Sequence, residues 1–248
     1  MIALIAAHPL ETTLLQRQLS PCEVLTLGGS SLYRGRLHGQ NILLFHCGVG
    51  KAAAAAAVTE LLLTYPVETV ILFGCGGAYL PGPLRVGDLA LASEEYFGDE
   101  GVITPDGFLD MEALNLPLLE RKGERYFNAL PVTTELLEQA FSSSRKLTER
   151  SGRRIAVGRF VTVSSCSGSD AQGELLQQRC DGICENMEGA AVARICLLRQ
   201  VPFLEIRGIS NLVENRDPRR WDLEAGCTIA QQAVLELLDS WANPRGSA

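Results

Sequence analysis

The chain has 248 residues, of which 46% are hydrophobic and 21% are charged, and its formal net charge is -7. This composition supplies enough apolar side chains for a sizeable core and excludes a largely disordered chain. The acidic balance argues against a nucleic-acid binder, because neutralising phosphates requires a basic surface. No apolar run approaches the roughly 20 residues that span a bilayer, and residues 1–7 lack the basic lead-in of a signal peptide. We expect a soluble, cytoplasmic protein.

The first third of the chain predicts alternating strands and helices. Residues 2–7 predict a buried strand, and the leucines after Pro9 repeat with helical spacing, which places Glu11 in the first turn of a helix. Further segments follow in chain order: a hairpin over 31–37 and 41–47, a helix over 52–63, a fully buried strand over 70–73 that runs into the glycine-rich segment 74–78, and a strand over 86–92.

The rest of the chain continues the alternation after a polar interruption. Residues 98–130 are rich in Gly, Pro and Asp, which predicts an irregular excursion over the site or at a subunit interface. The later elements are helices over 136–147 and 171–179, a strand over 155–164, a helix that opens at Glu188, a strand over 202–210 and a final helix to about Trp241. With no repeat and no linker, this pattern predicts one three-layer α/β domain over residues 1–242, followed by a disordered tail at 243–248.

Two glycine-rich segments resemble phosphate-binding loops only superficially. Residues 48–51 lack the first glycine of a Walker motif, because Phe45 stands there, and residues 74–78 lack the third glycine of a dinucleotide fingerprint, because Tyr79 stands there. Glycines after a buried strand still let a ligand approach the backbone closely.

The eight cysteines are scattered, with no Cys-x-x-Cys pair and no histidine pair beside them. A zinc site or a disulfide framework is therefore not expected, and reduced thiols acting as small core residues are the better interpretation. No spacing in the chain implies a metal or an organic cofactor.

Two segments carry the polar groups of a candidate site. Residues 185–191 open an apolar helix, and residues 207–211 end a strand. The side chains concerned are Met187, Glu188, Arg207 and Asn211. Ligands of open α/β sheets bind at the mouths of adjacent elements, and this set fits a ribose with its purine. Taken locally, Glu11 is an acid that complements a helix dipole.

The order and spacing of the motifs resemble the nucleoside phosphorylase and nucleosidase superfamily over nearly the whole chain. These motifs are the opening strand with its acid, segments 48–54, 74–78 and 86–88, and the two segments of the candidate site. The resemblance implies a nucleoside phosphorylase-like α/β/α sandwich with a central mixed sheet and a homo-oligomer, dimeric or larger.

The resemblance also implies roles for particular residues. Glu188 would hold the ribose hydroxyls, since a carboxylate accepts two hydrogen bonds from a vicinal diol, and Met187 would pack beside the sugar. Trp221 would lie against the sugar, with a plain core tryptophan as the alternative. Cys75 and Gly76 would contact the substrate, although Cys75 replaces a serine common in relatives.

Two departures select a branch of the superfamily. Residues 71–73 offer no cation where phosphorylases carry an arginine, and Glu11 falls where hydrolytic members place the acid that activates water. The resemblance then makes Glu11 the base, with Arg207 near it and the water. Asn211 replaces an aspartate of adenine-specific nucleosidases, and its amide fits a 6-oxopurine such as hypoxanthine or guanine.

Within the superfamily, the chain resembles the futalosine hydrolase family most. This implies hydrolysis of an inosine-like nucleoside with a carboxyphenyl tail, release of hypoxanthine, and a place in menaquinone biosynthesis. Arg216, Arg219 or Arg220 would meet the tail, with a solvated charge run as the alternative. Three further alternatives are a methylthioadenosine/S-adenosylhomocysteine-type nucleosidase, a purine nucleoside phosphorylase, and a nucleoside-binding protein without turnover.

Overall fold

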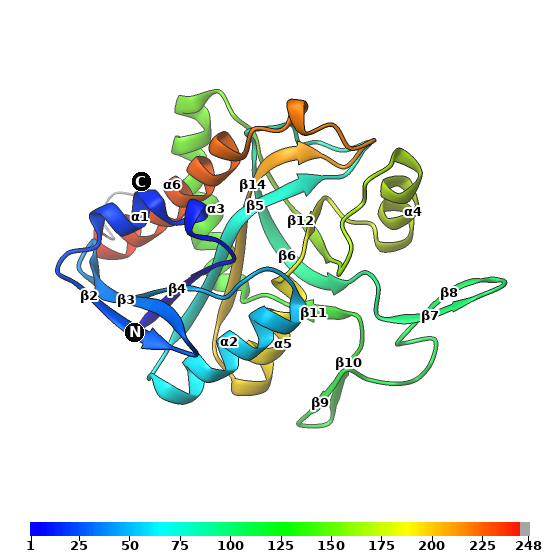
Figure 1. Ribbon diagram of the computed structural model, residues 1–248, viewed down its shortest axis with the longest axis horizontal. Helices are drawn as coiled ribbons and strands as arrows, with labels where there is room; N and C mark the ends of the chain where they lie inside the picture. The colour runs from blue at the N-terminus through cyan, green and yellow to red at the C-terminus, as the bar shows by residue number, and fades with distance from the viewer. Residues whose placement is uncertain (244–248) are drawn as a thin grey trace.

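The computed structural model describes residues 1–243, so the predicted tail lies outside the described residues except for Asn243. A ten-stranded sheet crosses the molecule, and helices pack on both of its faces (Figure 1). The prediction of a three-layer α/β/α sandwich with a central mixed sheet is confirmed.

The sheet is mixed, because some neighbouring strands pair parallel and others pair antiparallel. In spatial order its strands are β11 (Ala129–Pro131), β6 (Leu89–Phe97), β12 (Ile155–Thr162), β13 (Cys184–Asn186), β5 (Thr69–Ala78), β1 (Ile2–Ala6), β4 (Gln40–His46), β3 (Ser30–Leu37) and β2 (Cys22–Leu27). The tenth strand, β14 (Phe203–Leu212), pairs parallel with β5 and antiparallel with β6. β13 runs antiparallel to β5, whereas β1 runs parallel to both β4 and β5.

The helices divide between the two faces of the sheet. One face carries α1 (Thr13–Gln18), α3 (Thr134–Ser151) and α6 (Leu223–Ala242), and the other carries α2 (Lys51–Thr64) and α5 (Gly189–Arg199) (Figure 1). The remaining helix, α4 (Asp170–Cys180), packs its apolar side against Val161 of β12.

The central strands are apolar throughout because both of their faces are covered. In β1, Ala3 and Ile5 join the core under α2 and α5, whereas Leu4 and Ala6 join the core under α6. This alternation follows from the two-residue period of a strand, which sends successive side chains to opposite faces.

The prediction that residues 98–130 are irregular is wrong. They form two small hairpins, β7 (Gly101–Thr104) with β8 (Gly107–Asp110) and β9 (Leu119–Arg121) with β10 (Glu124–Tyr126), before β11 joins the edge of the sheet. Strands of three or four residues with largely exposed side chains carry almost no hydrophobic alternation, so the pattern does not reveal them.

One strand boundary and one edge strand also differ from the prediction. The strand expected over residues 86–92 begins at Leu89, because Gly87 has a φ of +87° and forms a turn before it. The edge strand β2 was not predicted; most of its side chains are exposed, so it lacks a clear apolar face.

Strands β5 and β14 supply backbone that lines the candidate site. The glycine-rich segment is the second half of β5 rather than a loop, and a Cβ at Gly74 would lie 2.2 Å from Oε1 of Glu11. β14 bulges between Ile209 and Asn211, which re-aims the side chains at its carboxyl end.

Candidate active site

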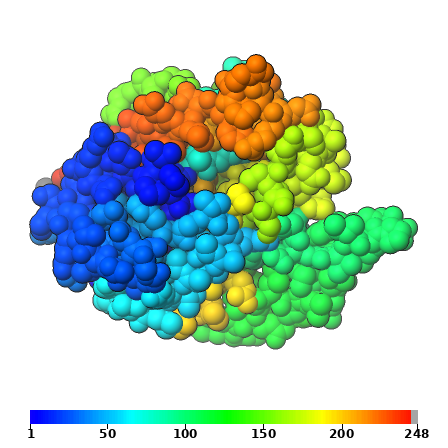
Figure 2. Space-filling model, viewed as in Figure 1, coloured from blue at the N-terminus to red at the C-terminus, as the bar shows by residue number. Residues whose placement is uncertain are grey.

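A cavity of about 360 Å³ lies where the carboxyl ends of β5 and β14 meet the loop after β1 and the start of α5. In the space-filling view the surface is hollowed where the dark-blue N-terminal segment approaches the orange segment before α6 (Figure 2). Every residue predicted for the site lines this cavity: Glu11, Cys75, Gly76, Met187, Glu188, Arg207, Asn211 and Trp221.

Glu11 ends a short 3-10 helix, η1 (Pro9–Glu11), and its side chain turns back toward the sheet. Its Oε2 accepts hydrogen bonds from the backbone N–H groups of Ala7 and His8, each at 3.0 Å, and its Oε1 accepts one from Cys75 N–H at 2.8 Å. Three backbone donors fix the carboxylate, which is only 5% exposed. Each oxygen of a carboxylate has two lone pairs, so Oε1 retains one that is free to accept a proton.

Glu188 stands at the N-cap of α5 and is held on both oxygens. Gly50 N–H donates to Oε1 at 2.9 Å, and Arg207 Nη2 donates to Oε2 at 3.1 Å. The backbone N–H of Glu188 itself donates to the side chain of Asn186 at 2.9 Å. The carboxylate is therefore oriented before any ligand arrives.

Arg207 is buried among acids and backbone oxygens. Its Nε donates to Glu205 Oε1 at 2.7 Å, and its Nη1 donates to Cys75 O at 3.0 Å. Burial opposes its charge, but the carboxylates of Glu205, Glu188 and Glu11 together raise the pKa of Arg207 well above its ordinary value. The guanidinium lies near Glu11, since both groups crowd the same face of Gly74. Its hydrogen bonds, however, position Glu188 and the β5 backbone.

A buried acid pair behind the cavity was not predicted. Burial, and then the neighbouring Glu205 carboxylate, raise the pKa of Glu95 well above its ordinary value; burial also raises the pKa of Glu205. Oε2 of Glu205 has no donor among the hydrogen bonds of the described residues. A proton on Glu95 would supply that donor, and we therefore predict that the two acids share one proton. Isolated glutamates on two separate strands gave no sequence signal for this pair.

Asn211 presents its amide at the bulge of β14. Its Oδ1 lies 2.9 Å from Ser210 Oγ, and its Nδ2 donates to Leu212 O at 3.1 Å. A primary amide has two N–H donors and two acceptor lone pairs, so one donor and one acceptor site remain for a ligand.

The loop before α6 brings a cation and an aromatic ring to the cavity mouth. The Arg216 guanidinium lies 4.3 Å from the centre of the Trp221 ring, and both residues line the cavity. Arg219 pairs with Asp217, and Arg220 pairs with Glu214. Of the three arginines predicted to meet a substrate tail, Arg216 is therefore the one at the cavity.

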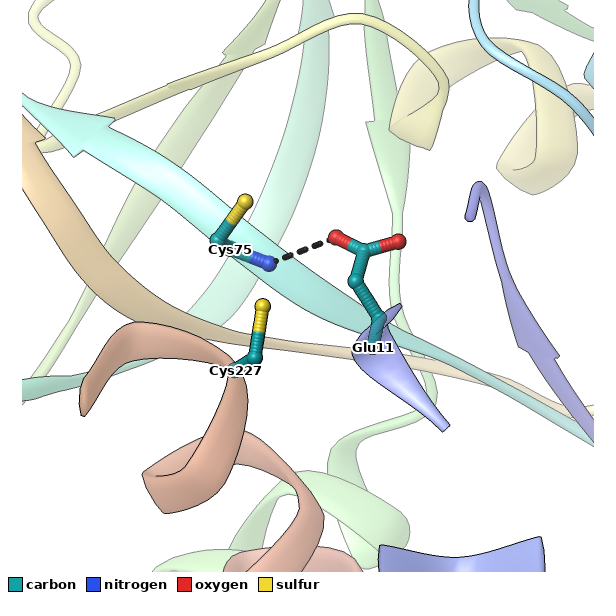
Figure 3. Close-up of side chains that lie close together, drawn as sticks. All are labelled: Glu11, Cys75 and Cys227. Carbon is teal, nitrogen blue, oxygen red and sulfur yellow. Dashed lines mark hydrogen bonds between the residues drawn. The ribbon is translucent and has the colours of Figure 1, made fainter. Parts of the chain in front are cut away.

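Glu11 also has two thiols beside it. The sulfur atoms of Cys75 and Cys227 and a carboxylate oxygen of Glu11 all lie within 4.8 Å of one another (Figure 3). Cys227 comes from the first turns of α6 and Cys75 from β5. These three residues have the donor types of a metal site, which the wide spacing in the sequence concealed.

Comparison with known proteins identifies the family of the chain. Residues 1–241 match the family described as the phosphorylase superfamily. Futalosine hydrolase of Thermus thermophilus is 34% identical over 209 residues, which cover 83% of this chain and 84% of that protein. The 5'-methylthioadenosine/S-adenosylhomocysteine nucleosidase of Tolumonas auensis is 30% identical over 240 residues, which cover 96% and 98%.

Solved structures share the fold. The 5'-methylthioadenosine/S-adenosylhomocysteine nucleosidase of Neisseria meningitidis, in complex with methylthio-immucillin-A, superimposes with a TM-score of 0.83 at 23% identity, over 96% of this chain and 98% of that one. Within the described residues, no helix has the length and apolar character needed to cross a membrane. The relatives are nucleosidases, which are N-glycosyl hydrolases, so the expectation of an N-glycosyl hydrolase is confirmed. The chain belongs to the phosphorylase superfamily.

Proposed function

We propose that the protein is a nucleosidase that hydrolyses the N-glycosidic bond of futalosine and releases hypoxanthine, as a step of menaquinone biosynthesis. The observation that carries this proposal is the presence of Glu11, Glu188 and Asn211 around one cavity. These side chains provide a base for water, an acceptor for sugar hydroxyls and an amide for an oxygen-bearing purine.

Hydrolysis is supported by the setting of Glu11. Backbone N–H groups hold its carboxylate in place, and its Oε1 accepts a proton from the attacking water at the anomeric carbon. A buried negative charge at this point repels phosphate, so phosphorolysis is disfavoured. Arg207 places the water only indirectly, through its hydrogen bonds to Glu188 and to the backbone beside Glu11.

Sugar binding falls to Glu188, with Met187 beside it. Both carboxylate oxygens of Glu188 keep a lone pair after accepting from Gly50 and Arg207, so each can accept one hydroxyl of a vicinal diol. Positive charge develops on the sugar as the bond breaks, and the nearby carboxylates of Glu188 and Glu11 stabilise it.

Asn211 supports a 6-oxopurine as the leaving base. Its remaining N–H donates to the 6-oxo group, while its oxygen accepts from protonated N7. The Arg216–Trp221 pair at the mouth offers an aromatic surface and a cation, which suits the aromatic carboxylate of the futalosine tail.

The deciding experiment is incubation of the protein with futalosine in phosphate-free buffer, with hypoxanthine followed by chromatography. Methylthioadenosine is tested in parallel, because relatives of 30% identity are methylthioadenosine/S-adenosylhomocysteine nucleosidases. We expect efficient hypoxanthine release without phosphate. Preferred adenine release would instead identify an adenine nucleosidase, phosphate-dependent turnover a phosphorylase, and tight binding without base release a binding protein.

The homo-oligomer and the cytoplasmic location stay predictions. Val102, Ile103 and Leu109 on the β7–β8 hairpin are 45%, 88% and 42% exposed, and this apolar cluster supports an association partner at the hairpin.

A further inference from the structure

We propose that Glu11, Cys75 and Cys227 form a binding site for a thiophilic divalent cation, with Zn²⁺ as the natural candidate. The sulfur atoms and one carboxylate oxygen lie within 4.8 Å of one another, and the residues come from η1, β5 and α6 (Figure 3). The chain therefore builds this cluster by folding, from residues that are far apart in the sequence.

The donor set fits zinc better than the hard cations. Zn²⁺ binds thiolates at about 2.3 Å and carboxylates at about 2.0–2.2 Å in a tetrahedron, so its ligand atoms lie roughly 3.5–3.8 Å apart. Separations of at most 4.8 Å need a closure of no more than about 1.0–1.3 Å to reach that geometry. Two sulfurs disfavour Mg²⁺ and Ca²⁺, which prefer oxygen ligands.

The charges around the cluster also favour a cation. Binding releases the thiol protons to solvent. Arg207 is the neighbouring positive charge, and its ion pairs with Glu205 and Glu188 offset it.

The cluster is accessible from the cavity. All three residues line the cavity wall, so a cation bound to them keeps its fourth position open to water or to a ligand. Bound metal would take the free lone pair of Glu11 Oε1. If the proposed function holds, that oxygen is the base, and the cation inhibits hydrolysis reversibly.

Cobalt spectroscopy tests the site without relying on activity. The reduced, chelator-treated full chain is titrated with Co²⁺ in anaerobic buffer, and thiolate-to-cobalt charge-transfer absorption is recorded. We expect one Co²⁺ per chain in a tetrahedral site, displaced by Zn²⁺. Cys75→Ser and Cys227→Ser should each weaken the absorption and lower the affinity by roughly 100-fold or more, whereas Glu11→Gln should lower the affinity but keep both thiolate contributions.

Cys166→Ser is the matched control, because Cys166 lines the same cavity but is not part of the cluster. Its titration should equal that of the wild type, and thermal unfolding should show that every variant is folded. Absence of charge-transfer absorption, or an affinity for Co²⁺ in the Cys75→Ser and Cys227→Ser variants equal to that of the wild type, overturns the proposal. Zn²⁺ inhibition of base release that disappears in Cys227→Ser supports it further. If the protein binds Co²⁺ at this cluster but releases no base, the proposed function is wrong while the proposed cation site stands.

Discussion

Nη2 of Arg207 lies 3.1 Å from Oε2 of Glu188, and both side chains are at most 4% exposed. A second ion pair joins Arg207 to Glu205, so one guanidinium is the ion-pair partner of two buried carboxylates. Removing the guanidinium leaves both carboxylates without a counter-charge in a region of low dielectric. The resulting loss of folding free energy exceeds the net stabilisation that the ion pairs provide.

Arg207→Met should therefore lower the free energy of unfolding by about 3–5 kcal/mol. Urea denaturation of the full chain measures the loss. The control is Arg34→Met, which breaks the exposed ion pair with Glu23 and should change the free energy by less than about 1 kcal/mol. Equal losses in the two variants would contradict the structural role assigned to Arg207.

Glu11→Gln should lower kcat for base release by about 10²–10⁴-fold, because an amide oxygen cannot take the proton of the attacking water. The glutamine keeps the size of the side chain, but its NH2 group cannot accept from the backbone N–H that it would face, so urea denaturation should also show a loss of about 1–3 kcal/mol. Glu138→Gln on the exposed side of α3 is the control and should retain full activity. Unchanged kcat in Glu11→Gln would remove the proposed base.

Much of the fold could be predicted because the central strands are apolar on both faces. The runs at residues 2–7 and 70–73 have no other stable place than the middle of a covered sheet. The hairpins between residues 98 and 130 could not be predicted, since their short strands bury too little apolar surface to leave a periodic pattern.

The candidate site divides in the same way. Glu188 and Asn211 belong to motifs with recognisable neighbours, so the resemblance placed both at the cavity. Glu95 and Cys227 stand in ordinary strand and helix sequence, and only the pairing of distant elements brings them beside Glu205 and Cys75. Such pairings depend on three-dimensional contacts that no local spacing records.

Asn211→Asp should shift the preference of the enzyme from 6-oxopurine toward 6-aminopurine nucleosides. The protonated carboxyl group of the variant can donate to N7 of adenine. The variant lacks the amide N–H that donates to a 6-oxo group in the wild type. The ratio of kcat/KM for futalosine to kcat/KM for its 6-amino analogue should fall by about 10²-fold or more. An unchanged ratio would show that Asn211 does not read the base.

Arg216→Gln should raise KM for the tailed substrate by roughly 10–100-fold, which corresponds to losing a hydrogen bond to a charged group. Inosine, which lacks the tail, is the comparison substrate, and its KM should stay constant. Arg220→Gln serves as the control variant, because Arg220 is paired with Glu214. An equal rise in KM for inosine would place Arg216 elsewhere than at the tail.

The buried pair of Glu95 and Glu205 should make stability depend on pH. Burial and the Glu205 charge raise the pKa of Glu95 above its ordinary value of 4.5, so the folded state holds a proton that the unfolded state releases. The stabilisation is complete below pH 4.5 and is lost as pH rises toward the folded pKa, with a slope of about -1.4 kcal/mol per pH unit for one proton.

Glu95→Gln tests this linkage, because its amide donates permanently to Oε2 of Glu205, the oxygen that otherwise needs the shared proton. Urea denaturation between pH 5 and about pH 8 should show a clearly flatter pH dependence in this variant than in the wild type. Glu138→Gln should keep the wild-type slope. If the Glu95 variant also keeps it, the two acids do not share a proton, and the pH dependence arises from other groups.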